Sequence, residues 1–363
     1  MIEKRKKIVF IIPSLGAGGA ERVIVSLANE YSILYDVTII SLFKKSSFYE
    51  IKKTIQLNYC EEKPVQSSNI LSGIRNNFLL YKKIKSILSS LKPEVVIAFT
   101  TTANIIGILA AKATNTRIII SERANPYLFV PNKFWRVLRK LTYPKAEKLV
   151  VQSDLSKQFY KSFVSEEKIA VLPNPLSKTL EKKRNSNAIR ENIILNVGRL
   201  DKNKSQDLLI KSFAQAKLKN WKLVLVGDGE QKMMYQELVN KLKINDQVTF
   251  TGTVSNTEHY YNKAKLFAFT SKSEGFPNAL IEAMYFGNCC ISTDCPSGPS
   301  TLISHEHNGV LIPIGDQHQL TKHLISLTEN EALRNYYATN AMVTSESYTL
   351  TNVFKLWLKL TQL

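Results

Sequence analysis

Two cations five residues apart follow a short apolar run in the second half of the chain. The run covers residues 193–197, and Gly198, Arg199 and Lys204 come after it. The Arg199 guanidinium can donate two parallel hydrogen bonds to phosphate oxygens, and the Lys204 ammonium supplies a point charge. Loops at the carboxyl ends of parallel strands are where α/β sheets bind their ligands. These residues alone leave two interpretations open, a phosphate-binding loop and a charged surface loop.

A pair of glutamates marks a second candidate segment, SEGFPNALIE at residues 273–282. It follows an apolar run, turns at Gly275, and has Pro277 where a helix can begin. Glu274 would lie in the loop, and Glu282 about one and a half turns into the helix. One carboxylate beside sugar hydroxyls and another beside a ribose diol would suit a nucleotide-sugar, with its diphosphate at the helix N-terminus. The alternative is a solvated glutamate pair that flanks a buried helix.

Glycines follow the first apolar run of the chain as well. Residues 8–12 lead into GAGGAER at residues 16–22, which includes Gly18 and Gly19, and then into an amphipathic helical pattern. Such glycines let a backbone approach a ligand closely, and a helix N-terminus offers N–H groups to an anion. The spacing is not GxGxxG, and no acidic residue closes a second strand, so a dinucleotide site is disfavoured. A tight strand-to-helix turn without a ligand is the alternative.

The elements that must position these residues are short apolar runs that alternate with longer helical patterns. Runs that are apolar on both faces indicate a parallel sheet covered by helices on both sides. Two sets of about six runs therefore predict two doubly wound sheets in an α/β protein. The expected strands are residues 8–12, 37–42, 95–99, 117–121, 149–152, 169–172, 193–197, 223–226, 248–250, 266–270, 290–293 and 309–312.

The length of 363 residues suits two domains. We expect an N-terminal Rossmann-like domain over residues 1–180 and a C-terminal one over residues 188–347, because turn and charge signals gather between them. The last segment, residues 348–363, predicts a helix that could pack back on the N-terminal domain. Its apolar side carries Val353, Leu356, Trp357 and Leu360.

The net charge of +19 is concentrated in the first half of the chain. Residues 1–180 hold 28 Lys and Arg against 13 Asp and Glu, so this half should face an anionic partner. The basic start of the chain and the apolar run that Pro13 breaks predict a first strand, not a signal peptide. No apolar run is long enough for a transmembrane helix. We expect reduced thiols in a cytosolic protein, since Cys60, Cys289, Cys290 and Cys295 have no paired metal spacing.

Two basic amphipathic segments lie in this first half. Residues 73–91 and residues 132–148 each place apolar side chains beside several lysines and arginines. Ordinary sheet-covering helices with a solvated basic face would explain them, and so would a surface attracted to anionic lipid. Nucleic acid is disfavoured as the anionic partner, because no recognition module or aromatic-basic strand pattern is present. The apolar positions are Ile74, Phe78, Tyr81, Leu88 and Leu91, then Phe134, Trp135, Leu138 and Leu141, and the second segment's cations include Arg139.

Four ordered motifs in the second half resemble the donor half of the family-4 retaining glycosyltransferases. They are GRLDKNK, VGDGE, FTGTV and SEGFPNALIE, and the GAGGAER loop is similar to the same group. The resemblance covers nearly the whole chain and implies the GT-B fold, two Rossmann-like domains facing a central cleft. It is closest to a subgroup met among bacterial polysaccharide, O-antigen and lipid-linked oligosaccharide transferases.

The resemblance also implies roles for the candidate residues. Arg199 and Lys204 would bind the donor diphosphate, Glu282 the ribose, and Glu274 the hexose near the reacting carbon. The remaining expected contacts of the nucleotide-sugar are Gly18, Gly19, Gly198, Gly252, Val254, Gly275, Phe276, Pro277, Asn278 and Leu280. Many relatives carry a histidine in a first-domain loop where this chain reads SERANP, with Arg123 in its place. Arg123 could steady the departing phosphate or grip the acceptor, or Glu122 and Arg123 could simply brace the cleft between the domains.

The expected activity is therefore that of a retaining hexosyltransferase. It would move a hexose or N-acetylhexosamine from a UDP-sugar to a polyprenyl-diphosphate-linked or other lipid-linked oligosaccharide, on the inner face of the cytoplasmic membrane. With Arg199, Lys204 and helix N-termini to neutralise UDP, neither a metal nor another cofactor is expected. Same-face attack is favoured over a covalent intermediate on Glu274. The alternatives are a sugar-nucleotide epimerase on the same fold and a non-catalytic UDP-sugar-binding scaffold.

Overall fold

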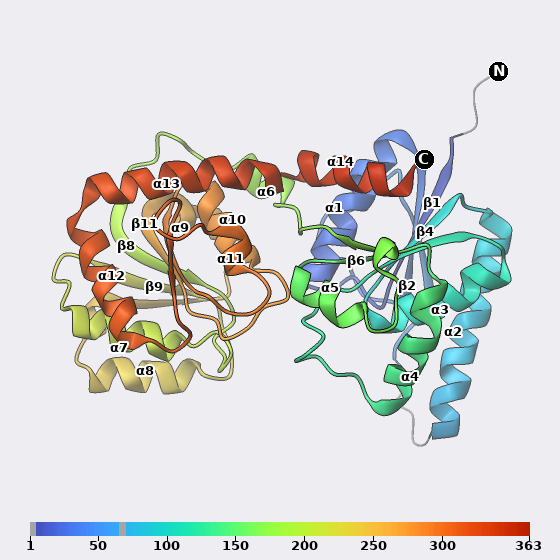
Figure 1. Ribbon diagram of the computed structural model, residues 1–363, viewed down its shortest axis with the longest axis horizontal. Coiled ribbons are helices and arrows are strands. Elements are labelled where there is room, and N and C mark those ends of the chain that lie inside the picture. Colours follow the sequence, from blue (N-terminus) through green and yellow to red (C-terminus); the bar gives the residue numbers. More distant parts are fainter. Residues whose placement is uncertain (1–4, 65–69) are drawn as a thin grey trace. The chain divides into compact units, whose positions relative to one another are not determined.

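The computed structural model describes residues 5–64 and 70–363, so part of the basic start of the chain lies outside it. The chain divides into two compact units, Met1–Pro175 with Val353–Leu363, and Leu176–Asn352. Each unit is built on one parallel sheet with helices around it (Figure 1). The predicted fold class, two parallel-sheet α/β domains, is confirmed. None of the helices in the described ranges has the length and apolarity that crossing a bilayer requires.

The first unit holds a seven-stranded sheet in the order β3-β2-β1-β4-β5-β6-β7. Its strands are β1 (Lys7–Ile12), β2 (Asp36–Phe43), β3 (Gln56–Glu61), β4 (Val95–Phe99), β5 (Arg117–Ser121), β6 (Lys148–Val151) and β7 (Ile169–Val171). Its helices are α1 (Gly19–Leu34), α2 (Ile70–Leu91), α3 (Thr101–Ala113), α4 (Lys133–Thr142), α5 (Asp154–Tyr160), most of α14 (Leu350–Thr361), and the 3₁₀ turns η1 (Tyr143–Lys145) and η2 (Glu166–Lys168).

Alternate residues of β1 enter two separate cores, one on each face of this sheet. Val9 and Ile11 pack in a core with residues of α2 and α3. Ile8 and Phe10 pack in a second core with residues of α1 and α14. Burial on both faces explains why this strand reads as an unbroken apolar run.

The second unit holds a six-stranded sheet in the order β10-β9-β8-β11-β12-β13. Its strands are β8 (Glu191–Val197), β9 (Lys222–Val226), β10 (Val248–Gly252), β11 (Ala264–Phe269), β12 (Cys289–Thr293) and β13 (Val310–Ile312). Its helices are α6 (Lys178–Glu181), α7 (Gln206–Ala216), α8 (Lys232–Lys241), α9 (Thr257–Lys263), α10 (Asn278–Tyr285), α11 (Pro299–Leu302), α12 (Gln317–Glu329), α13 (Glu331–Ser345), and the 3₁₀ turns η3 (Asn245–Gln247) and η4 (Glu346–Tyr348). Residues of α10 share one core with the sheet, and residues of α7, α8 and α12 share the other.

The strand order reverses at one point in each sheet. In the second unit β8 is hydrogen-bonded to both β9 and β11, with Leu195 opposite Phe267. The loops after β8 and β11 therefore leave the same sheet edge side by side. Such a switch point is the usual ligand site of an open parallel sheet. In the first unit the reversal lies between β1 and β4.

Three details of the sequence interpretation were wrong. The strand β3 was not predicted, because its sequence QLNYCE has no apolar run and among its residues only Cys60 is buried. On α14 the buried positions include Phe354, whereas Leu356 is 41% exposed. Arg139 is not a surface cation of α4 but is buried, with its guanidinium over the Phe159 and Tyr160 rings.

Candidate functional site

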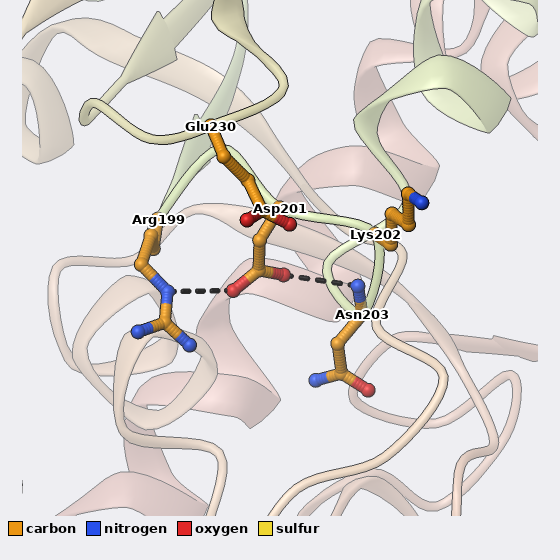
Figure 2. A pocket seen from close by; sticks show the side chains of 5 residues that line it. All are labelled: Arg199, Asp201, Lys202, Asn203 and Glu230. Atoms are coloured by element: carbon orange, nitrogen blue, oxygen red, sulfur yellow. Dashed lines mark hydrogen bonds and ion pairs between the residues drawn. The ribbon is translucent and has the colours of Figure 1, made fainter.

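The loop after β8 is organised by the carboxylate of Asp201. Its Oδ2 accepts a hydrogen bond from Arg199 Nε (2.6 Å), and its Oδ1 accepts from the backbone N–H groups of Asn203 (3.0 Å) and Lys204 (2.9 Å). Figure 2 shows Asp201 between Arg199 and Asn203. Burial acts to raise the pKa of the Asp201 carboxyl, but these hydrogen bonds outweigh it and leave the pKa below its ordinary value. The turn thus fixes Arg199 and Lys204 on one loop.

The loop after β11 brings Glu274 to Lys204. The Lys204 Nζ atom lies 2.5 Å from Glu274 Oε1, and the two side chains are only 23% and 12% exposed. The two loops are tied further by hydrogen bonds from Asn203 Nδ2 to the Ser273 carbonyl and from Thr270 Oγ1 to the Lys204 carbonyl, both 2.8 Å. The structure therefore joins two motifs that stand 70 residues apart in the sequence.

Glu282 lies on the buried side of α10. The helix begins at Asn278 with Pro277 as its N-cap residue, so the proline stands one position before the first helical residue. Glu282 is 6% exposed, and its Oε2 accepts a hydrogen bond from the Tyr261 hydroxyl (3.0 Å). Tyr261 is a partner that sequence reasoning did not identify. Its hydroxyl orients the Glu282 carboxylate. The alternative of a solvated glutamate pair therefore does not describe Glu282, which is buried.

A pocket with a volume of about 440 Å³ opens beside the Arg199 loop (Figure 2). A cavity of this size falls in the range of small-molecule sites. Its lining is Arg199, Asp201, Lys202, Asn203 and Glu230. In the described part of the chain, Arg199 is the only residue of that lining that we predicted as a ligand contact. Lys202 and Glu230 were missed, although both stand inside the motifs GRLDKNK and VGDGE.

The glycines of VGDGE press against the Arg199 loop backbone to backbone. A Cβ atom on Gly227 would lie 2.0 Å from the Gly198 carbonyl oxygen, and one on Gly229 would lie 2.3 Å from the Leu200 carbonyl oxygen. Gly227 also has a φ of +136°, which other residues rarely adopt. The turn is therefore a support for the loop that carries Arg199.

Replacing Gly227 by alanine is expected to lower the free energy of unfolding by about 3 kcal/mol, because backbone strain adds to a clash with backbone. Gly315→Ala is the matched control, since Gly315 has a φ of +77° but nothing within 4 Å of a Cβ atom. The control should cost only about 1 kcal/mol. Urea titration of both variants measures the difference, and equal losses would show that the two loops do not press on each other.

In the first unit a lysine that sequence reasoning missed, Lys45 after β2, reaches the predicted glycine loop. Gly18 is the N-cap residue of α1 and Gly19 its first residue. The Tyr49 hydroxyl donates to the Gly18 carbonyl (3.2 Å). The Lys45 Nζ atom lies 2.9 Å from where a Cβ atom on Gly16 would stand. The small residues of this loop therefore have a cation from a neighbouring segment beside them.

Arg123 lies in the loop after β5, partly buried among aromatic rings. Its guanidinium carbon is 4.7 Å from the centre of the Phe99 ring and 5.7 Å from that of Trp357. Its Nη1 donates to Asn174 Oδ1 (2.6 Å). Burial lowers the pKa of the Arg123 guanidinium to about 9, although the neighbouring Glu122 carboxylate acts in the opposite direction. Arg123 is thus a partly buried cation held against rings, not a solvated loop residue.

Glu122 points into a separate buried network beneath this loop. Its Oε1 accepts hydrogen bonds from the hydroxyl groups of Tyr143 and Thr101, the latter at 2.9 Å, and lies 3.4 Å from Asn104 Nδ2. Burial raises the pKa of the Glu122 carboxyl above its ordinary value, because it outweighs these hydrogen bonds. Glu122 therefore anchors the loop after β5 through buried hydrogen bonds. The bracing of the domain cleft by Glu122 and Arg123 stays a prediction.

Comparison with known proteins places this arrangement in a class. The model described as glycosyl transferases group 1 matches residues 177–343, and the model of Glycosyltransferase Family 4 matches residues 17–179. The two parallel-sheet units, each matching a domain of such an enzyme, define a glycosyltransferase. The chain belongs to glycosyltransferase family 4, and the resemblance inferred from its motifs is confirmed.

Two relatives from Campylobacter jejuni are similar over nearly their whole length. One is the GalNAc-α-(1→4)-GalNAc-α-(1→3)-diNAcBac-PP-undecaprenol α-1,4-N-acetyl-D-galactosaminyltransferase, 34% identical over 98% of this chain and 98% of that protein. The other is the N-acetylgalactosamine-N,N'-diacetylbacillosaminyl-diphospho-undecaprenol 4-α-N-acetylgalactosaminyltransferase, 31% identical over 94% of this chain and 96% of that protein. Among solved structures, Anabaena Alr3699/HepE in complex with UDP has a TM-score of 0.82 at 19% identity, covering 98% of this chain and 100% of that one. It shares the GT-B fold.

Proposed function

We propose that this glycosyltransferase moves an N-acetylhexosamine or a hexose from a UDP-sugar to an oligosaccharide on a polyprenyl diphosphate, in the assembly of a bacterial glycan. The Lys204–Glu274 contact carries the donor half of the proposal, because it places a cation for a diphosphate beside a carboxylate for sugar hydroxyls. The names of both Campylobacter jejuni relatives support the acceptor half, and they make UDP-N-acetylgalactosamine the first donor to test.

In the proposed reaction Arg199 and Lys204 bind the diphosphate and Glu274 orients the sugar. The acceptor hydroxyl oxygen attacks the anomeric carbon on the face from which UDP leaves, and its proton passes to the departing β-phosphate oxygen. The products are UDP and a glycoside of unchanged anomeric configuration. Two fixed cations neutralise the charge that develops on UDP, so the step requires no metal ion. Arg123 is the candidate for an additional contact to an anionic group of the substrates.

The donor and the metal requirement can be tested in one assay. UDP-N-acetylgalactosamine should raise the melting temperature, because a ligand that binds only the folded state stabilises it by mass action. It should also support transfer to a synthetic polyprenyl-diphosphate-linked oligosaccharide, at a rate that EDTA changes by less than about twofold. GDP- and ADP-sugars are the controls. Stabilisation by these controls alone, or strict dependence on Mg²⁺ or Mn²⁺, would contradict the proposal.

We infer a membrane-facing surface on the first unit from its exposed apolar side chains. Leu128 and Phe129 in the loop before α4 are each 65% exposed, and Phe78 on α2 is 50% exposed. A hollow of about 340 Å³ lined by residues of α2, α3 and α4 connects these helices. Among the described side chains of α2, the buried ones are Leu80, Ile84 and Leu88, and these pack in the core as those of an ordinary covering helix do.

The charge around this surface favours an anionic lipid as its partner. Residues 70–93 and 123–146 contain no Asp or Glu. Exposed cations lie among the apolar side chains, namely Arg75, Lys82, Lys133, Arg136 and Lys140. Apolar side chains surrounded by Lys and Arg are typical of surfaces that lie in the plane of an anionic membrane. We propose that the enzyme binds the inner face of the cytoplasmic membrane through this surface.

Replacing Leu128 and Phe129 together by serine is expected to weaken binding to phosphatidylglycerol vesicles at least about tenfold. Each substitution removes apolar side-chain surface that would otherwise be buried in the membrane. Ile189→Ser with Met233→Ser is the matched control, because these residues are 89% and 74% exposed on the second unit. Co-sedimentation with vesicles measures both. Equal binding by wild type and the Leu128 and Phe129 variant would show that this loop does not contact the membrane. Phosphatidylcholine vesicles, which carry no net charge, should bind neither protein.

A further inference from the structure

Arg123 differs from Arg334, another arginine of this chain that lies over an aromatic ring. Arg334 lies over Trp221, but its Nη1 donates to the carbonyls of Leu327 (2.6 Å) and Thr328 (3.0 Å). The backbone thus satisfies Arg334 as a structural residue. The guanidinium of Arg123 is held in another way, mainly by rings.

The polar partners of Arg123 are few for a buried cation. Nη1 donates to the neutral amide oxygen of Asn174, which is itself buried. Nε and Nη2 are covered and have no hydrogen-bond partner among the residues that the structure describes. A guanidinium has five N–H donors, and leaving them unpaired in a buried site is unfavourable. The described residues therefore hold the Arg123 guanidinium in place without a hydrogen-bonded carboxylate, although the Glu122 carboxylate acts on its charge without a hydrogen bond.

Two stacked rings provide that position. Phe99 and Trp357 are both fully buried, with their ring centres 6.0 Å apart and their planes inclined by 20°. Ring faces attract a guanidinium through their quadrupole, and they leave its charge unneutralised. Phe99 ends β4, immediately beside the β5 loop in the sheet, so it is fixed by the sheet itself.

Trp357 comes from the last helix of the chain, and that helix is fastened to the first unit. The Tyr31 hydroxyl is hydrogen-bonded to Thr361 Oγ1 (3.1 Å), and the Tyr31 ring meets the Phe354 ring edge-on at 4.8 Å. Arg117 Nη2 donates to the Thr361 carbonyl (3.1 Å). These contacts lie on either side of Trp357 along α14 and hold its ring in place.

The elements around Arg123 meet at the carboxyl edge of the first sheet. Arg123 lies two residues after the end of β5, and Asn174 lies three residues after the end of β7. Ligands bind outside this edge in open α/β sheets. An anionic group there would give the guanidinium a directly hydrogen-bonded charged partner, which it lacks among the described residues.

We propose that Trp357 is a positioning residue for Arg123, with its ring holding the guanidinium where it can engage a phosphate of the donor or the acceptor. This inference rests on the proposed function, in which Arg123 contacts an anionic group of the substrates. A carboxylate in the place of the ring would compete with that phosphate, whereas the neutral ring of Trp357 does not. The C-terminal helix is thereby part of the reaction machinery and not only of the core.

A double-mutant cycle tests the proposal. Trp357→Leu keeps an apolar side chain but removes the ring, and it should lower kcat about tenfold while KM for the UDP-sugar changes less than threefold. Arg123→Ala should lower kcat about 100-fold. In the Arg123→Ala background, Trp357→Leu should cause less than a further twofold loss, because its target is absent. Trp357→Phe, which keeps a ring, should stay within threefold of wild type.

The controls separate positioning from packing. Trp221→Leu removes the other arginine-stacking tryptophan, and its activity per folded molecule, with the folded fraction taken from urea titration, should match wild type. If Trp357→Leu reduces kcat equally in both backgrounds, or leaves kcat unchanged in wild type, the positioning role is overturned. If Arg123→Ala retains full activity, the role of Arg123 fails instead. If the wild-type protein releases no UDP from any UDP-sugar with its acceptor present, the proposed function itself fails.

Discussion

Replacing Lys204 by methionine is expected to lower kcat/KM for sugar transfer by about 10³-fold while the protein stays folded. Methionine keeps the unbranched apolar stem of lysine and removes its charge. The lost ammonium would have neutralised the departing diphosphate, so the loss should appear in kcat as well as in KM for the UDP-sugar. Steady-state kinetics and UDP binding by calorimetry measure the two contributions.

The main complication is the carboxylate that Lys204 leaves behind. Glu274 is only 12% exposed, so removal of its cation leaves a poorly solvated negative charge beside the expected diphosphate. The double variant Lys204→Met with Glu274→Gln removes both charges and controls for the repulsion. Lys211→Met is the matched lysine control, since Lys211 pairs with Asp207 on the surface of α7. Full activity of Lys204→Met would show that the diphosphate does not bind at this loop.

The strands could be predicted where the sheet buries both of their faces. Residues 95–99 and 117–121 were predicted with the bounds that β4 and β5 have. The edge strand β3 has the sequence QLNYCE and is mostly exposed, so it lacks the apolar run on which the prediction depended. The position of β3 is set by its pairing with β2, where Leu57 stands opposite Ile39. No local sequence pattern indicates this pairing.

The helix faces were predicted less well, because burial of a helix depends on what packs against it. Phe78 and Leu88 fit one helical stripe, yet Phe78 is half exposed and Leu88 is buried. Among the described side chains of α2, the buried ones lie from the middle of the helix onward. Arg139 shows the same limit, since the rings that cover it lie on α5 and could not be placed from the local pattern of α4.

At the candidate site, residue types, their order and the family resemblance singled out Arg199, Lys204 and Glu274, and the structure brings Lys204 and Glu274 together. The loops that carry them follow neighbouring strands, and this neighbourhood could be expected from the topology of open α/β sheets. The residues that hold these side chains in place could not be predicted. Asp201 was seen as one residue of a motif, and nothing in the sequence connects Trp357 with Arg123, because that contact needs the C-terminal helix to pack in the first unit.

Substitution of Glu274 should cause the second large loss of activity, and the size of this loss depends on the role of the carboxylate. Replacing Glu274 by alanine is expected to lower kcat/KM by at least about 10³-fold, because the sugar loses its orienting contact and Lys204 loses its partner. Glu274→Gln retains the shape and one carbonyl oxygen. If Glu274 only orients the sugar, the glutamine variant should lose about 10- to 100-fold and remain measurably active.

A nucleophile would behave differently, since an amide cannot form the glycosyl ester of a double displacement. Glu274→Gln would then be as inactive as Glu274→Ala. We expect the orienting role, because the Glu274 carboxylate is already bound to Lys204 Nζ at 2.5 Å, and an ion pair lowers the nucleophilicity of its oxygens. The anomeric configuration of the product, read by NMR from an α-linked donor, completes the test. Residual activity of Glu274→Gln with an α-linked product would establish same-face transfer, whereas a β-linked product would contradict the retaining mechanism altogether.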